Sequence, residues 1–262
     1  TIGGDSLVVE GLMGAGVDPH LYKASEGDVS KLFEADVVFY GGLHLEGKLV
    51  DIFERMHKSG RKAYAVSDAL PENTLISSEA FASSFDPHIW FDVSNWKKVA
   101  RFVAEKLIAE DQQNKHYYSQ NLENYLTELD QLEDYILQKT DELPPQKRIL
   151  VTAHDAFSYF GKAYQFQVVG LQGLSTATEA GVQDVQELTR FIIQNQIKAI
   201  SVESSVPRRT IEALKEAVTA GGHPVNIGGS LFSDALGNPG TPEGTYIGMF
   251  TYNINTIVNA LK

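Results

Sequence analysis

The chain of 262 residues contains no cysteine, so it can form neither a disulfide bond nor a thiolate metal site. It has no run of 18 apolar residues, which a membrane-spanning helix would need. Its first residues lack the basic and apolar pattern of a secretory signal peptide. Any transition-metal site in this chain must therefore be built from histidine, aspartate and glutamate.

Positive charge is scarce. The chain has 22 Lys and Arg against 34 Asp and Glu, a formal net charge of −12, and no dense basic cluster. Nucleic acid is therefore not a predicted partner, because phosphate binding needs concentrated positive charge. A negative field weakly favours cations near the surface. The hydrophobic share of 43% is enough for one large domain or for two lobes with their own cores.

Glycine and proline are both absent from residues 94–143, where strand-like patterns are also nearly absent. Apolar side chains recur there every three or four residues, at Tyr118, Leu122, Tyr125, Leu129, Leu132 and Ile136. This stripe predicts a helix over residues 113–143, about 46 Å long at the α-helical rise per residue. The stripe is short for a coiled coil, so a helix that braces two lobes fits better.

Strand-like and helix-like segments alternate on both sides of this helix. The predicted strands are residues 6–13, 35–42, 62–70, 148–155, 166–173, 198–205 and 223–230. The predicted helices are residues 26–35, 45–60, 155–164, 182–196, 208–221 and 244–262. The alternation predicts an α/β fold of parallel sheets flanked by helices. We expect a first lobe at 1–112, a connecting helix at 113–143 and a second lobe at 144–262.

Seven histidines are the candidate metal ligands. His20, His88 and His154 each follow a predicted strand or extended segment, at the carboxyl ends where open α/β sheets bind ligands. The others carry no such signal: His57 and His116 lie on predicted solvent faces of helices, His223 lies in a turn, and His44 has no assigned role.

The tripeptide Asp-Pro-His occurs twice, at residues 18–20 and 86–88. Proline fixes its own φ and keeps the preceding aspartate extended, so a stiff backbone aims each histidine. A single copy is better explained as a turn with a capping aspartate. Two copies, with a third strand-end histidine in a chain without cysteine, favour a metal site.

A fourth ligand should follow a strand of the second lobe. Both Asp234, in "LFSDALG", and Glu203, in "SVESS", qualify, and either carboxylate completes a set that suits zinc or manganese. Asp234 could instead cap a helix, and Glu203 could instead hydrogen-bond a ligating imidazole. The same residues could hold a catalytic zinc, so a metallohydrolase is the alternative class. The chain has no H-E-x-x-H motif and no G-x-S-x-G motif, which disfavours hydrolases.

Several longer motifs share one resemblance. They are "GAGVDPHLYKASEGD", "ADVVFYGGLHLEGK", "FDPHIWFDVSNW", "LVTAHDAFSYFGKAY", "GLQGLST", "VESSVP" and "LFSDALG" with "GTYIGM". Together they resemble the metal-specific substrate-binding proteins of ABC importers, the TroA-like family (cluster A-I or cluster 9). The resemblance is collinear from about residue 8 to residue 260 and covers nearly the whole chain.

The resemblance implies two lobes, a rigid connecting helix and a metal ion buried between the lobes. It implies His20, His88, His154 and Asp234 as the ligands, and so favours Asp234 over Glu203. It further implies an extracytoplasmic monomer, either a cell-surface lipoprotein or a periplasmic protein, that delivers its ion to a membrane permease. A lipid anchor upstream of this chain would be its contact with the membrane. Family members begin with a further strand and helix, so the lobe at 1–112 is expected to lack them.

The family also bears on which metal is bound. Zinc-specific members typically carry a long loop rich in histidine and acidic residues before the second Asp-Pro-His. In this chain the corresponding segment, residues 71–87, is short and contains no histidine. We therefore expect Mn²⁺ as the cargo, with Zn²⁺ also binding in vitro because nitrogen-rich sites prefer it. A surface adhesin, a role sometimes proposed for this family, is a further alternative. Because histidine must be neutral to bind metal, affinity should fall as the pH falls through roughly 6.5.

Overall fold

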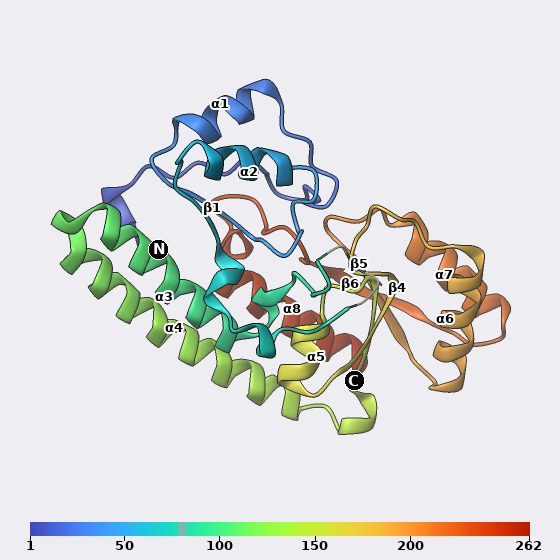
Figure 1. Cartoon of the computed structure of the whole chain (residues 1–262). Coiled ribbons are helices and arrows are strands. Elements are labelled where there is room, and N and C mark those ends of the chain that lie inside the picture. The colour runs from blue at the N-terminus through green and yellow to red at the C-terminus, as the bar shows by residue number, and fades with distance from the viewer. Residues whose placement is uncertain (79–80, 82) are drawn as a thin grey trace. The chain divides into compact units, whose positions relative to one another are not determined.

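A computed structural model describes residues 1–78, 81 and 83–262 of the chain (Figure 1). Residues 79, 80 and 82, in the segment 71–87 used above to predict the metal, lie outside the described part. The described chain forms two compact units. Unit 1 comprises Thr1–Met13 and Pro19–Glu133, and unit 2 comprises Gly14–Asp18 and Asp134–Lys262. Within the described residues, no helix has both the length and the apolar character needed to cross a membrane.

Unit 1 contains a small parallel sheet covered by helices. Strand β1 (Val38–Tyr40) pairs with β2 (Ala63–Ala65) in parallel, as the alternation of segments predicts. Helices α1 (Glu26–Glu34) and α2 (Val50–Lys58) lie beside each other in Figure 1. Their apolar faces share one core with the strands, formed by Leu32, Val38, Leu49, Ile52, Phe53, Met56 and Ala63.

The start of α1 agrees with its prediction and the start of α2 does not. Ser25 caps α1 in a capping box with Asp28, which satisfies two backbone N–H groups at the helix start. The helix predicted from residue 45 begins instead at Val50. Gly42, Leu43 and His44 have φ of 82°, 50° and 66°, a left-handed conformation, and the turns that follow them delay the helix.

The strand predicted at residues 6–13 is wrong. Gly4–Ser6 form a 3₁₀ turn, and in the described structure residues 7–11 join no strand ladder. Val8 is 93% exposed and Val9 is 82% exposed. A strand is stabilised by a hydrogen-bonded neighbour and by burial of one face, and this segment has neither here.

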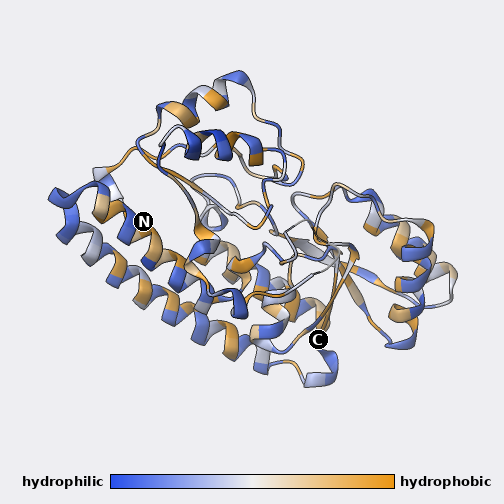
Figure 2. Ribbon diagram, in the orientation of Figure 1, coloured by the Kyte–Doolittle hydropathy of each residue, from blue (hydrophilic) through white to orange (hydrophobic). Residues whose placement is uncertain are grey.

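Two long helices complete unit 1 and lead into unit 2. Helix α3 (Val93–Glu110) begins at the cap Asp92, whose side chain accepts the N–H of Ser94. Helix α4 spans Lys115–Asp141, which confirms the long connecting helix predicted at 113–143. Five of the six predicted stripe residues are buried, namely Tyr118, Tyr125, Leu129, Leu132 and Ile136. Figure 2 shows apolar and polar residues alternating along both helices.

Unit 2 is also α/β. Its strands are β3 (Ile149–His154), β4 (Gln167–Gln172), β5 (Ala199–Glu203) and β6 (Asn226–Leu231), and its helices are α5 (Ser158–Tyr164), α6 (Val182–Gln194), α7 (Arg209–Ala220) and α8 (Tyr246–Leu261). Parallel ladders join β3 to β4 and β5 to β6, and β3 lies next to β5. The core between these strands and α6 and α7 includes Val151, Leu188, Ile200, Ile211 and Leu214.

Short 3₁₀ turns connect the larger elements, at Gly4–Ser6, Val66–Ala69, Glu72–Thr74, Ile89–Phe91, Gln112–Asn114, Pro145–Lys147 and Pro242–Gly244. Two strand ends meet in unit 2. Strands β3 and β5 are adjacent, and their last residues, His154 and Glu203, are in contact.

Candidate metal centre

In unit 2, a carboxylate holds His154 in place. Glu203 accepts the backbone N–H of His154 at 2.9 Å through Oε1, and its Oε2 lies 2.6 Å from Nδ1 of the same residue. Both side chains are fully buried. With Nδ1–H donated to Glu203, the lone pair of the imidazole lies on Nε2, the atom that would bind a metal.

Nε2 of His154 faces Asp234. The distance from Nε2 to Oδ2 is 3.2 Å, and neither side chain is accessible to solvent. Asp234 follows β6 in a loop whose backbone is hydrogen-bonded to Asn253 of α8. The Asn253 side-chain amide donates to the carbonyl of Phe232 at 2.7 Å and accepts its N–H at 3.0 Å. The backbone two residues before Asp234 is therefore fixed by a packed helix, which reduces the cost of ordering this loop around an ion.

Two opposing effects set the protonation of His154. Burial lowers its pKa, because the charged imidazolium is poorly solvated there. The negative charges and hydrogen bonds of Glu203 and Asp234 act the other way and prevail, so the pKa of His154 lies well above its usual value of 6.5. In the metal-free protein the two carboxylates therefore favour the doubly protonated imidazolium form of His154.

In unit 1, the two Asp-Pro-His histidines meet. Nε2 of His20 lies 3.4 Å from Nε2 of His88, and both side chains are buried. The Phe81 ring packs nearly perpendicular to His20 at a centroid distance of 6.4 Å, and Trp90 packs against His88 at 5.2 Å. Aromatic groups thus cover the two imidazoles and limit contact with water.

Asp86 holds His88 as Glu203 holds His154. Its Oδ1 accepts the backbone N–H of His88 at 2.8 Å and lies 2.7 Å from Nδ1 of the ring. The aspartate and the histidine are both fully buried. This contact again leaves Nε2 of the imidazole for a ligand. The sequence predicts Asp86 only as part of a stiff turn or as a cap, and its position two residues before the histidine is the signal for this second role.

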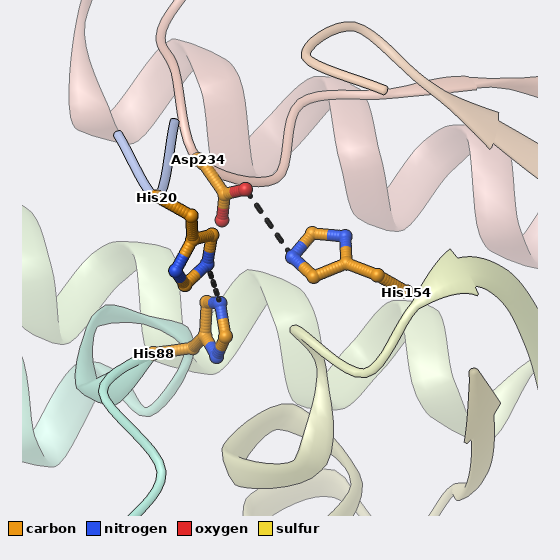
Figure 3. A group of neighbouring side chains, drawn as sticks. All are labelled: His20, His88, His154 and Asp234. Carbon is orange, nitrogen blue, oxygen red and sulfur yellow. Dashed lines mark hydrogen bonds and ion pairs between the residues drawn. The ribbon is translucent and has the colours of Figure 1, made fainter. Parts of the chain in front are cut away.

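The separation within each pair matches shared coordination of an ion. Ligand atoms on one tetrahedral zinc ion lie roughly 3.3 Å apart, given metal–nitrogen bonds of about 2.0–2.1 Å. The His20–His88 nitrogens are 3.4 Å apart, and the His154 nitrogen and Asp234 oxygen are 3.2 Å apart. Dashed lines in Figure 3 mark these two pairs. Each pair can therefore bind two adjacent positions of a metal ion without rearrangement.

The other four histidines have different surroundings. His57 and His116 are exposed, as predicted, and Nε2 of His57 contacts the carbonyl of Ala63. His223 is half-buried and its Nε2 contacts the carbonyl of Ile197 at 2.7 Å. His44 is exposed on the left-handed turn before α2. None of these contacts resembles a ligand pair.

Comparison with known proteins identifies the family. The model of the family described as "ZnuA: Zinc-uptake complex component A periplasmic" matches residues 1–260. The zinc-binding protein TroA of Treponema pallidum is 50% identical over 253 residues, which cover 97% of this chain and 81% of that protein. The manganese-binding lipoprotein MntA of Bacillus subtilis is 47% identical over 261 residues, covering 100% of this chain and 85% of that protein.

The fold agrees with a solved structure of the same family. The periplasmic zinc-binding protein TroA from Treponema pallidum superimposes with a TM-score of 0.96 at 49% identity, covering 99% of this chain and 93% of that one. The α/β fold with a long helix, predicted from the sequence, is confirmed. The chain is similar to TroA and MntA and therefore belongs to the ZnuA family of metal-binding substrate-binding proteins.

Proposed function

We propose that His20, His88, His154 and Asp234 together bind one divalent transition-metal ion (Figure 3). The observation that carries this proposal is the spacing within each pair, because both distances suit two ligands of a single ion. Asp86 and Glu203 support it, since each occupies Nδ1 of its histidine and leaves Nε2 for the metal. Glu203 is thus proposed as a partner of His154 rather than as a ligand.

We further propose that the protein captures this ion outside the cytoplasmic membrane and delivers it to the permease of an ABC importer. Similarity to a zinc-binding periplasmic protein and to a manganese-binding lipoprotein supports this role. In this proposal the protein acts as a monomer, and a lipid anchor holds it at the membrane or it lies free in the periplasm. The regions predicted at 1–112 and 144–262 are its two metal-binding lobes. The contacts of the described residues give no support to the alternative function as a surface adhesin.

The cargo is proposed to be Mn²⁺, with Zn²⁺ binding in vitro. Metal-free protein titrated with either ion should bind one ion per chain, and Zn²⁺ should bind more tightly because a site with three imidazoles favours it. Isothermal titration calorimetry gives the stoichiometry, and elemental analysis of protein isolated from its native cells identifies the cargo. Binding of fewer than one ion per two chains would refute the site. Native protein that contains zinc and no manganese would refute the choice of cargo.

The protein is proposed to have no catalytic activity, as expected for a substrate-binding protein. A catalytic zinc keeps an open position for water, whereas four protein ligands fill a tetrahedral ion. Zinc-loaded protein assayed with ester, amide and phosphoester substrates should therefore hydrolyse none of them above the rate of free zinc. A turnover that His154→Ala abolishes would restore the metallohydrolase alternative.

Asp86→Asn is expected to weaken Zn²⁺ binding about 10-fold, at the lower end of the effect of losing a partner behind a metal ligand. The asparagine can still accept the backbone N–H of His88, but it no longer provides the charge that holds Nδ1–H. Asp92→Asn is the matched control, because asparagine also caps helices well and Asp92 caps α3. Titration against a chelator of known affinity measures the Zn²⁺ affinity of both variants. Equal affinities in the two variants would contradict the role of Asp86.

A further inference from the structure

The five residues before Pro19 belong to the other unit. Gly14–Asp18 pack with unit 2, although Thr1–Met13 and Pro19–Glu133 on either side belong to unit 1. A turn closes this segment through the N–H of Val17 and the carbonyl of Gly14. Gly16 has φ +72°, and a Cβ there would lie 3.3 Å from the carbonyl oxygen of Ser204, so the segment lies against the backbone that follows β5.

A side-chain hydrogen bond fastens the end of the segment. Thr176, in the loop after β4, donates its hydroxyl to Oδ2 of Asp18 at 2.5 Å. Thr176 is only 8% exposed, so water competes poorly for its hydroxyl, and Asp18 is half-buried. A hydrogen bond to a carboxylate is among the stronger kinds in proteins, and partial burial strengthens it further.

This bond lies next to a proposed metal ligand. His20 follows Asp18 by two residues, so their Cα atoms are at most about 7 Å apart. Pro19 fixes its own φ, and it restricts Asp18 to extended conformations. Few rotatable bonds therefore remain between the fastened carboxylate and the imidazole. Asp18 thereby links the first Asp-Pro-His motif to Thr176, 158 positions further along the chain.

We infer that the Asp18–Thr176 hydrogen bond positions His20 for metal binding by fastening residues 14–18 to unit 2. The inference rests on the proposed function, in which His20 shares an ion with His154 and Asp234 of unit 2. While the bond is intact, the His20 imidazole is confined to a short reach from that unit. Without it, the segment gains conformational freedom, and His20 must be ordered again each time it binds the ion.

The test is the rate at which a fluorescent chelator removes Zn²⁺ from the full chain in a stopped-flow instrument. Thr176→Val keeps the shape but loses the hydroxyl, and we expect dissociation about 10-fold faster than in the unmodified protein. Thr176→Ser retains the hydroxyl and should stay near the unmodified rate. Thr178→Val is the matched control, because it makes the same substitution at an exposed position two residues away.

A second measurement separates positioning from a general loss of structure. In a His20→Ala background, Thr176→Val should change the Zn²⁺ affinity by less than about twofold, because the bond acts through His20. A 10-fold effect that persists in this background would overturn the inference, as would unaltered dissociation from Thr176→Val. Should the valine variant not fold, Asp18→Asn weakens the same bond and should speed dissociation about threefold. No change in that variant would overturn the inference too.

The outcome for the unmodified protein distinguishes the two proposals. If it binds one Zn²⁺ per chain and Thr176→Val releases the ion at the same rate, only the positioning role of Asp18 and Thr176 fails. If it binds no Zn²⁺, the proposed function fails, and the inference built on it fails as well.

Discussion

His154→Ala is expected to lower the affinity for Zn²⁺ by at least about 100-fold, more than the loss of a partner behind a ligand typically costs. The substitution removes a proposed nitrogen ligand and also the group that separates two buried carboxylates. Glu203 lies 2.6 Å from one ring nitrogen of His154, and Asp234 lies 3.2 Å from the other. Competition with a chelator of known affinity measures the change.

The control for this variant is His116→Ala, the same substitution at an exposed histidine of α4. It should leave the affinity within about twofold. Because removing one member of a buried ion pair destabilises proteins by about 3–5 kcal/mol, circular dichroism must confirm that the His154 variant is folded. His20→Ala is the alternative if it is not, because His20 belongs to the other proposed ligand pair, with its Nε2 at 3.4 Å from Nε2 of His88. Affinity near that of the unmodified protein in both variants would exclude the proposed ligand set.

The strand-end histidine of unit 2 could be predicted from sequence because local signals sufficed. His154 ends a run of β-branched and apolar residues, and ligands of parallel α/β sheets gather at carboxyl ends. The long helix could be predicted equally well, since its apolar stripe repeats over several turns and the segment contains no glycine or proline. Its observed bounds differ from the predicted ones by two residues at each end, within the ordinary uncertainty of helix ends.

Local signals could not assign the acidic residues around the histidines. Asp234 follows β6 and Glu203 ends β5, and their contacts with His154 depend on the orientation of its ring. Asp18 bonds Thr176, which is 158 positions away. These contacts are tertiary, so a pattern within a few residues of each carboxylate does not contain them.

The errors in unit 1 have a related cause. Residues 6–13 have strand-like composition, but a strand forms only where a partner and a buried face exist, and the exposed Val8 and Val9 have neither. The late start of α2 follows from left-handed backbone at Leu43 and His44, residues that rarely adopt it. In both places the surrounding structure overrides the local preference of the sequence.

The affinity for Zn²⁺ is expected to fall about 100-fold as the pH is lowered from 7.5 to 5.5, because the ion must displace at least one proton. The relevant group is His154. In the metal-free protein, burial lowers its pKa, but the charges of Glu203 and Asp234 outweigh burial and raise the pKa well above 6.5. A raised pKa means that the proton competes with the metal already at neutral pH. The fall should therefore begin above the pH of roughly 6.5 expected for an unperturbed histidine.

Glu203→Gln tests the electrostatic cause directly. The amide oxygen can accept either Nδ1–H or the backbone N–H of His154, whereas the carboxylate accepts both, and the negative charge that raises the pKa of His154 most is gone. The imidazole of this variant should lose its proton at a lower pH than that of the unmodified protein. Between pH 6.5 and 8, the affinity of the variant should then depend less steeply on pH. Glu216→Gln, at an exposed position of α7, is the matched control and should keep the original slope.

Two measurements decide the question. Calorimetric titration in buffers of different ionisation enthalpy counts the protons released when Zn²⁺ binds, and it should find about one more near pH 7 for the unmodified protein than for Glu203→Gln. NMR titration of the metal-free protein should show the His154 ring losing its proton above pH 6.5. A ring that titrates below pH 6.5, together with pH-independent affinity above it, would mean that the two carboxylates do not outweigh burial. The imidazole would then already be neutral when the ion arrives, and the ion would displace no proton from it.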